Sequence, residues 1–331
     1  MVRARLHEQE IREAIGVPGP GDLVVETVAP LAQIEDRCVC FVNGEPEPEM
    51  RESLARSAGC IVIAPAGSSL AGEPRSSRVL ESDDPRAAMA RVLNLIRELG
   101  RQPPWVEAPS IAPGARISPL AAIDGDVRIE DGVQIGPFCT IGPDVSIGRG
   151  TVLHAGVRVY SRVSIGEQSS IGPNSVIGLE GFGFVRHEAG HKTRMPQLGG
   201  VAIGSHVEID ALGLVQGGAI ATTVVEDHAK IDSLVLVGHG VRVGRGATVT
   251  AGSVLAGSSA VGEEAWVGIN TSLREGRRIG ARALVGMDSS VQHDLPDDAL
   301  TRAPRPEVEA RSAGDERSAI GFAGRKRPPA G

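Results

Sequence analysis

The sequence predicts a mainly β protein, in which a parallel β-helix of hexapeptide repeats follows a small N-terminal α/β domain. Large aliphatic side chains recur every six residues from Val225 to Val291, and a small or apolar residue follows each by four positions, except at Arg277. An α-helix repeats about every 3.6 residues and a strand about every two, so this period indicates an array of short units. The composition agrees, because 43 glycines and only 2% aromatic residues suit a thin core of Ile, Val and Ala.

Three such units close one triangular coil of eighteen residues, so side chains eighteen positions apart stack in successive coils. Neighbouring coils then hydrogen-bond at the usual strand spacing of about 4.8 Å. The large repeat positions of this array are Val225, Ile231, Val237, Val243, Val249, Leu255, Val261, Val267, Leu273, Ile279, Val285 and Val291.

Residues 1–108 lack the six-residue period, and their hydrophobic patterns are typical of a small α/β domain. We expect helices over 6–15 and 85–99, strands over 22–28, 38–42 and 59–64, and a proline-containing linker at 102–104.

The coil domain is expected over residues 109–296. Its first array runs from Ile111 to Ile177 and then stops for a glycine-rich excursion over residues 178–200. A long segment that leaves an ordered array is often functional. The hexads resume at Ile203 in a different phase.

Two further departures complete the plan of the chain. A four-residue insertion near Ala221 precedes the long array. After Pro296 the period is lost, and residues 297–331 form a small-residue, Pro/Gly-rich tail that we expect to be partly disordered.

The charge balance and the cysteines limit the class of protein. A net charge of −7 offers no basic surface for nucleic acid. No run of 18 apolar residues is present, and Met1–Glu10 is charged, so we expect a cytoplasmic protein without stable membrane insertion. The four cysteines form no CxxC pair, which favours buried, reduced thiols.

His239 differs from the other histidines in its surroundings, because it lies between two glycines in LVLVGHGVRVG. It follows Val237 by two positions and therefore faces outward from the coil. Eighteen residues later, the same place in the next coil is Gly257. We therefore expect an accessible imidazole ring and a peptide N–H without a side chain to lie one strand spacing apart.

This pair of groups suits acyl transfer. A neutral imidazole, with an ordinary pKa of about 6.5, accepts the proton of an attacking amine or hydroxyl at pH 7. A nearby backbone N–H stabilises the oxyanion that forms at a thioester carbonyl. The alternative is an ordinary exposed histidine. Asp232, one face back, either orients the ring or simply belongs to a turn.

Two alternatives to an acyltransferase remain, a zinc enzyme and a protein without catalytic activity. A β-helical zinc hydratase holds its metal with three histidines, and His154, His187 and His191 have a comparable spacing. The last two lie in the excursion, outside the coil register that would direct them at one ion, so we expect no metal. The other interpretation is a scaffold without catalytic activity.

Several segments together resemble the UDP-3-O-acylglucosamine N-acyltransferases of lipid A synthesis. They are GLEGFGF at 178–184, GHKTRMPQLGGVAIGSHVEIDA at 190–211, ID at 231–232, GHG at 238–240 and VTAGSVLAGS at 249–258. The resemblance extends from about Asp22 to Pro304. Hexads alone indicate only a superfamily that includes many sugar acetyltransferases, whereas the GFGF excursion ending in MPQLGG is much more specific.

The resemblance implies a left-handed β-helix and a homotrimer, with active sites in the grooves between neighbouring subunits. It implies transfer of a 3-hydroxyacyl chain from acyl carrier protein to the 2-amino group of UDP-3-O-acylglucosamine. The acyl thioester on phosphopantetheine is then a co-substrate, and no further cofactor is needed. The family's general base falls on His239 and its oxyanion glycine on Gly257.

The resemblance also assigns residues to the substrate. In CFVN, Phe41 and Asn43 match the residues that stack on and hydrogen-bond to the uracil of the family's substrate. The segment around Phe182 and Phe184 is expected to form part of the groove wall.

Some family features are missing here. The tyrosine that usually follows the uridine-contacting Asn is replaced by GEPEPEMRE, which offers only Met50, and a second family histidine falls on or beside Gly276. The acceptor sugar and the acyl chain length therefore stay open. The main alternative is an acetyl-CoA-dependent nucleotide-sugar N-acetyltransferase.

Overall fold

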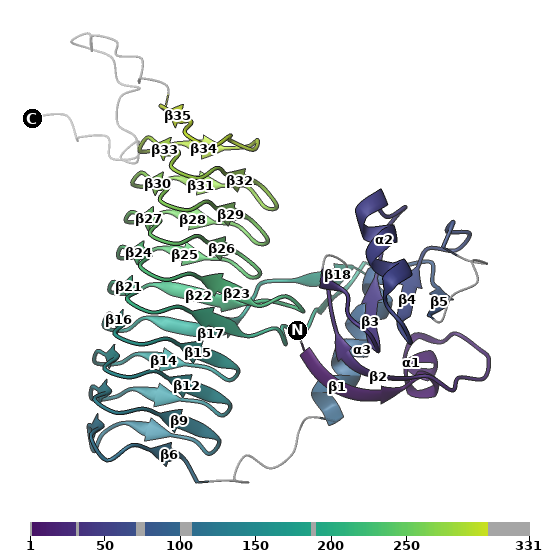
Figure 1. The fold of residues 1–331 in the computed structure, drawn as a ribbon, viewed down its shortest axis with the longest axis horizontal. Coiled ribbons are helices and arrows are strands. Elements are labelled where there is room, and N and C mark those ends of the chain that lie inside the picture. Colours follow the sequence, from purple (N-terminus) through teal and green to yellow (C-terminus); the bar gives the residue numbers. More distant parts are fainter. Residues whose placement is uncertain (1, 31–32, 71–76, 100–107, 187–189, 304–331) are drawn as a thin grey trace, which may run out of the picture.

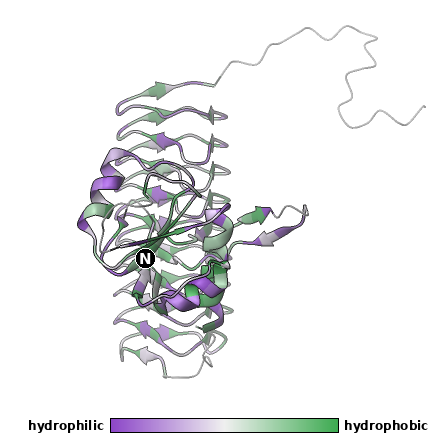
Figure 2. Ribbon diagram, turned by 90° about the vertical axis from the view of Figure 1, so that its right-hand side faces the viewer, coloured by the Kyte–Doolittle hydropathy of each residue, from purple (hydrophilic) through white to green (hydrophobic). Residues whose placement is uncertain are grey.

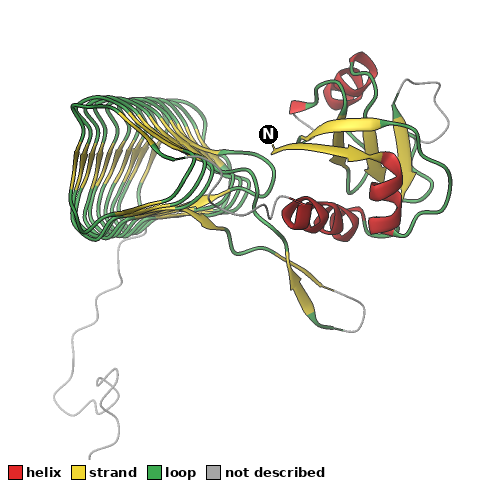
Figure 3. Ribbon diagram, turned by 90° about the horizontal axis from the view of Figure 1, so that it is seen from below, coloured by secondary structure: helices red, strands yellow, loops and turns green. Residues whose placement is uncertain are grey.

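Each hexad forms one short strand and one turn in the computed structural model. The structure describes residues 2–303 except 31–32, 71–76, 100–107 and 187–189. Strands of mostly two or three residues alternate with turns, and three strands close each coil (Figure 1). Viewed along the stack, the outlines of the coils superpose (Figure 3). The predicted linker at 102–104 and most of the predicted tail lie outside the described residues.

The large aliphatic side chains of the repeats point into the stack and form one continuous core from Val127 to Val291. Burial of one such side chain contributes about 1.5–3 kcal/mol. Many turns place a residue other than glycine at positive φ, for example Asp144 at 56°, His206 at 59° and Asn270 at 56°. Asp, Asn and His tolerate this conformation better than most residues do, which explains their place in the repeat.

The described strands of the coils form three parallel sheets, which we call face 1, face 2 and face 3. Face 1 contains β7 (Arg116–Ile117), β10 (Gln134–Ile135), β13 (Val152–Leu153), β16 (Ser170–Ile171), β21 (Glu208–Ile209), β24 (Lys230–Ile231), β27 (Thr248–Val249), β30 (Trp266–Val267), β33 (Leu284–Val285) and β35 (Leu300–Thr301).

Face 2 contains β8 (Ala122–Ile123), β11 (Thr140–Ile141), β14 (Arg158–Val159), β17 (Val176–Glu180), β22 (Leu214–Gly217), β25 (Leu236–Val237), β28 (Val254–Leu255), β31 (Ser272–Leu273) and β34 (Ser290–Val291). Face 3 contains β6 (Ser110–Ile111), β9 (Val127–Ile129), β12 (Val145–Ile147), β15 (Val163–Ile165), β20 (Val201–Ile203), β23 (Thr223–Val225), β26 (Arg242–Val243), β29 (Ala260–Val261) and β32 (Arg278–Ile279).

The pairing register confirms that residues eighteen apart stack. Val237, for example, pairs with Leu255 of the next coil. The two interruptions leave this ladder intact, because Ile177 pairs with Val215 across the excursion. Val215 then pairs with Val237 across the four-residue insertion. Both interruptions are therefore loops added between face 2 and face 3, and the phase change at Ile203 is a consequence of the first one, the excursion.

The excursion contains structure that the sequence pattern did not predict. Its strands β18 (Phe184–Arg186) and β19 (Lys192–Arg194) form an antiparallel hairpin. Figures 2 and 3 show this hairpin projecting from the side of the stack of coils.

The N-terminal unit has a five-stranded sheet in the order β1-β2-β3-β4-β5, with β1 antiparallel to β2 and the other neighbours parallel. Its elements are β1 (Val2–His7), α1 (Glu8–Ile15), β2 (Val24–Val28), β3 (Cys38–Phe41), α2 (Pro48–Arg56), β4 (Ile61–Ala64), β5 (Arg78–Glu81) and α3 (Pro85–Leu99). The prediction for α3 is confirmed at both ends.

Three elements of this unit were missed, and one helix was placed too early. Leu6 belongs to β1 and not to the first helix, which begins at Glu8 after the His7 cap. No apolar period marks α2, which has a proline in its first turn and carries many charges. The strand β5, of only four residues, is partly exposed at the sheet edge.

The coil domain extends beyond the predicted end at Pro296. The strand β35 pairs with β33, although its Thr301 follows Val285 by fewer than eighteen residues. Because this last coil is shorter than eighteen residues, its strand does not fall at a six-residue interval and was not predicted. The cysteine prediction is confirmed, because all four thiols are free and buried.

The excursion joins the two parts of the molecule. Val185, Met195 and Leu198 belong to the same apolar cluster as the buried side chains of α1 and α3. The hairpin that leaves the coils therefore packs against the N-terminal unit.

Candidate active site

One edge of the stack collects the irregular features of the sequence. We call the column of turns between face 2 and face 3 the His239 edge. The excursion, the four-residue insertion, His239, Gly257 and Glu275 all lie in successive turns of this edge. The repeat thus places a histidine, a glycine and a carboxylate in one column, with two long loops in the coils below them.

The backbone around His239 is held by hydrogen bonds to the preceding coil and to the next coil. Gly240 adopts φ of 68°, which glycine permits without strain, and its N–H donates to Thr223 Oγ1 at 2.8 Å. The carbonyl of His239 accepts the Ser258 N–H at 2.8 Å. These contacts fix the backbone at His239, and its side chain is half-buried.

The imidazole ring lies directly over Gly257. A Cβ atom added at Gly257 would lie 2.5 Å from both Cε1 and Nε2 of His239. Such distances are far inside van der Waals contact, so the ring fits only because residue 257 has no side chain. The Gly257 N–H has no acceptor among the described residues. The structure therefore brings the two predicted groups together, as the register required.

The excursion covers the other side of His239. A Cβ atom at Gly181 would lie 2.7 Å from His239 Cβ and 3.0 Å from its Cδ2. The first glycine of GFGF therefore allows the excursion backbone to lie against the histidine. Two glycines, Gly181 and Gly257, flank the same ring.

Burial lowers the pKa of His239 below its ordinary value of about 6.5. The carboxylate of Glu275 opposes this effect, and the guanidinium of Arg86 on α3 adds to it. A lowered pKa keeps the imidazole neutral at pH 7, which is the form that accepts a proton.

Asp232 lies at a different edge, between face 1 and face 2. One carboxylate oxygen accepts the Ser233 N–H at 2.6 Å and the other accepts the Ala251 N–H at 3.1 Å. Its observed contacts therefore fix two turns of the coil, and its predicted role with substrate stays a prediction.

Phe182 directly follows Gly181, the excursion glycine that lies against His239, and Phe184 is two residues further along. Their rings meet edge to face with centroids 4.9 Å apart, and the Arg194 guanidinium lies 5.0 Å from the Phe184 centroid. Arg194 also donates to the Gly181 carbonyl at 3.1 Å. Phe182 is 77% exposed, so an apolar ring next to the site is free to contact a ligand.

Phe41 and Asn43 lie at and just after the end of β3 in the N-terminal unit, and Figure 1 shows β3 apart from the coils. Phe41 ends β3 and is half-buried, and Asn43 is exposed just after it. Downstream, Glu45 binds Arg51 at 2.5 Å and also accepts the Ser69 N–H at 3.1 Å. These contacts order the loop after Asn43. Met50 lies in α2, and its side chain is outside what the structure describes.

The three histidines of the zinc alternative differ in their surroundings. The His154 ring lies 3.3 Å from Ser170 Oγ, and His191 is exposed. His187 lies outside the described residues. Among the residues that the structure describes, no group of three or more His, Cys, Asp or Glu side chains is arranged to hold a metal ion.

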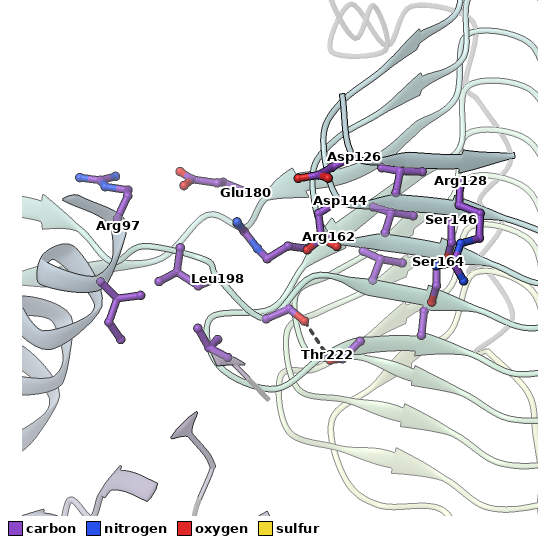
Figure 4. A pocket seen from close by; sticks show the side chains of 17 residues that line it. Arg97, Asp126, Arg128, Asp144, Ser146, Arg162, Ser164, Glu180, Leu198 and Thr222 are labelled. Atoms are coloured by element: carbon purple, nitrogen blue, oxygen red, sulfur yellow. Dashed lines mark hydrogen bonds between the residues drawn. The ribbon is translucent and has the colours of Figure 1, made fainter. Parts of the chain in front are cut away.

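A cavity of about 920 Å³ lies between the coils and α3 (Figure 4). Asp126, Asp144 and Arg162 line it from the His239 edge, and Arg97 lines it from α3. Its lining does not include His239 or Gly257. The cavity is polar, with charges of both signs, and is separate from the imidazole.

Sequence reasoning missed two charged groups that act on His239, and one polar side chain that lies beside Gly181, the excursion glycine next to the ring. Glu275 stands two coils above it, so the eighteen-residue register would have revealed this carboxylate. Arg86 comes from α3, and no local pattern connects it with the coils. Gln197, in MPQLGG, has its Oε1 2.9 Å from the place where a Gly181 Cβ would lie.

Comparison with known proteins agrees with this architecture. The family model "Bacterial transferase hexapeptide (six repeats)" matches residues 126–161 and 144–179. The UDP-3-O-acylglucosamine N-acyltransferase of Delftia acidovorans is 41% identical over 264 residues, which cover 78% of this chain and 74% of that relative. The chain belongs to the UDP-3-O-acylglucosamine N-acyltransferase family. As a member of this family it is an acyltransferase, and the predicted resemblance is confirmed.

Other members of the UDP-3-O-acylglucosamine N-acyltransferase family match over shorter segments. The UDP-3-O-acylglucosamine N-acyltransferase 2 of Legionella pneumophila (strain Lens) is 44% identical over 86 residues. The matched segment covers 26% of this chain and 25% of the Legionella pneumophila relative, which is about a quarter of each.

The solved structure of the UDP-N-acetylglucosamine acyltransferase from Campylobacter jejuni has the same fold as the coil domain of this chain. The two superpose with a TM-score of 0.51 at 22% identity, over 56% of this chain and 70% of that one. This likeness concerns the fold, which is the predicted left-handed β-helix. Within the described residues, no helix has the length and apolar character needed to cross a membrane.

Proposed function

We propose that the protein transfers a 3-hydroxyacyl chain from the phosphopantetheine thioester of acyl carrier protein to the 2-amino group of UDP-3-O-acylglucosamine. The observation that carries this proposal is the His239 ring, which lies over Gly257 at an edge covered by the excursion. Family membership supports the nucleotide-sugar acceptor.

In this mechanism His239 is the general base. Its neutral imidazole accepts a proton from the acceptor amine as the nitrogen attacks the thioester carbonyl. The Gly257 N–H donates to the oxyanion of the tetrahedral intermediate. The intermediate then collapses to the amide, and the leaving thiolate takes the proton from His239.

We further propose that the active protein is a cytoplasmic homotrimer in which a second copy covers face 2. Outward side chains of face 2 form an aliphatic stripe at Val176, Leu214, Leu236 and Val254, next to the His239 edge. Val254 is 39% exposed, and apolar side chains in such a row are typical of a contact between subunits. Phe41 and Asn43 then supply the uridine contacts of the assembled groove.

A direct assay tests the donor and the acceptor. With UDP-3-O-acylglucosamine as acceptor, we expect the mass of the product to rise by one 3-hydroxyacyl group when an acylated carrier protein is the donor. Acetyl-CoA is expected to give no product. An acetylated product with acetyl-CoA, and none with the carrier protein, would replace this proposal by the acetyl-CoA alternative.

The charges around His239 give a prediction for pH dependence. The rate needs the neutral imidazole, so kcat/KM rises with pH through the pKa of His239, which burial places below its ordinary value. Glu275→Gln removes a group that stabilises the imidazolium, so the acidic limb should move to lower pH. Arg86→Gln removes a repelling cation, so the limb should move to higher pH. Shifts in the same direction for both variants would contradict the assignment of His239.

A further inference from the structure

Gln197 is a buried amide with one atom left without a partner. The residue is only 4% exposed. Its Nε2 donates to the Met195 carbonyl at 3.0 Å, which fixes the orientation of the amide. Its Oε1 is buried and has no hydrogen-bond partner among the described residues. A buried acceptor without a partner lowers the stability of the fold, so its presence here calls for a physical reason.

The oxygen and the His239 ring approach the same point. The position of a Cβ atom on Gly181 would lie 2.9 Å from Gln197 Oε1 and 3.0 Å from His239 Cδ2. A Cβ atom on Gly183 would in turn lie 3.2 Å from Gln197 Nε2. The side-chain amide of Gln197 therefore lies along the backbone of Gly181–Gly183. Its Oε1 atom is at the Gly181 end, near the His239 ring, and its Nε2 atom is at the Gly183 end.

The charge that develops at this place during acyl transfer is the imidazolium of His239. A carbonyl oxygen without another partner presents the negative end of its dipole, and a buried setting strengthens its effect on a nearby charge. We infer that Gln197 is a positioning residue that orients His239 and stabilises its protonated form through Oε1. This inference rests on the proposed role of His239 as the base.

Other charged groups also face His239 and must be kept constant in a test. Glu275 faces it from the turn between β31 and β32, and Arg86 faces it from α3. Arg194 lies on the excursion, with its guanidinium on the Gly181 carbonyl. The turn between β22 and β23 contributes no charged side chain.

Two substitutions of similar shape separate this effect from loss of packing. Gln197→Met removes the carbonyl dipole, and Gln197→Glu replaces it by a carboxyl group. We expect the titration of the His239 imidazole, followed by NMR in the full-length protein without substrate, to move to lower pH in Gln197→Met and to higher pH in Gln197→Glu. We expect kcat of Gln197→Met to fall about tenfold, less than loss of the base itself.

The outward Gln134 on face 1 provides the matched control, because Gln134→Met changes the same side chain far from the His239 edge. It should leave both the titration and kcat unchanged. Unchanged titration in both Gln197 variants, or shifts in one direction, would overturn the inference even if acyl transfer is intact. Opposite shifts in a protein that fails to acylate UDP-3-O-acylglucosamine would support the inference and reject the proposed function.

Discussion

Replacement of His239 by alanine is expected to lower kcat by about 10²-fold or more, which is the usual effect of losing a general base. The ring is held over Gly257 and beside Gly181, so no neighbouring group takes its place. The substitution removes a half-buried side chain from a turn and leaves the strand ladder of β25 and β28 unchanged. Steady-state acyl transfer, measured together with thermal unfolding, checks both expectations.

A second histidine serves as control for this variant. His206 is exposed in a turn between face 3 and face 1, and its ring stacks on His228 with centroids 4.9 Å apart. His206→Ala therefore removes the same group from a turn of the same kind at another edge. It should retain full activity. Equal activity of His239→Ala and His206→Ala would exclude His239 as the base.

Gly257→Ala is expected to lower kcat by about 10²-fold, in the range observed when oxyanion stabilisation is lost. The added Cβ would lie 2.5 Å from His239 Cε1 and Nε2, so the ring has to leave its position over the Gly257 amide. The base and the oxyanion donor are then separated. The loss should appear in kcat, and the affinity for the nucleotide part of the acceptor should change little.

Gly142 offers a control glycine at the same edge in an earlier coil, one register position before that of Gly257. A Cβ atom there would lie 3.2 Å from the nearest atom, the Ser161 nitrogen, so the neighbouring backbone has to move by only a few tenths of an ångström. Gly142→Ala should keep near-normal turnover. If Gly257→Ala keeps the wild-type rate as well, the contact between ring and glycine has no part in catalysis.

The coil domain could be predicted closely because its signal is repeated many times. Each hexad supplies the same inward aliphatic, and the spacing of eighteen residues fixes which side chains stack. The spacing of eighteen residues therefore predicted that His239 and Gly257 are neighbours in successive coils, and the structure places them in contact. The strand β35 escaped this reasoning because a shorter return breaks the count.

The rest of the site comes from contacts between parts of the chain that share no period. The charge of Arg86 lies close enough to lower the pKa of His239 because α3 packs against the excursion through apolar contacts. Nothing in the sequence around Gln197 distinguishes it from the rest of MPQLGG. The burial of its Oε1 atom depends on the path of the backbone at Gly181–Gly183. In the N-terminal unit, α2 and β5 carry too few buried apolar residues to give a pattern in sequence.

Both long loops enter and leave the spiral at one corner, and the strands on either side still find their partners. Added chain at that corner is therefore compatible with an unchanged scaffold. Exchanging the segment 178–200 between relatives should alter which molecules are accepted while preserving the frame, which makes this corner the natural place to redesign selectivity.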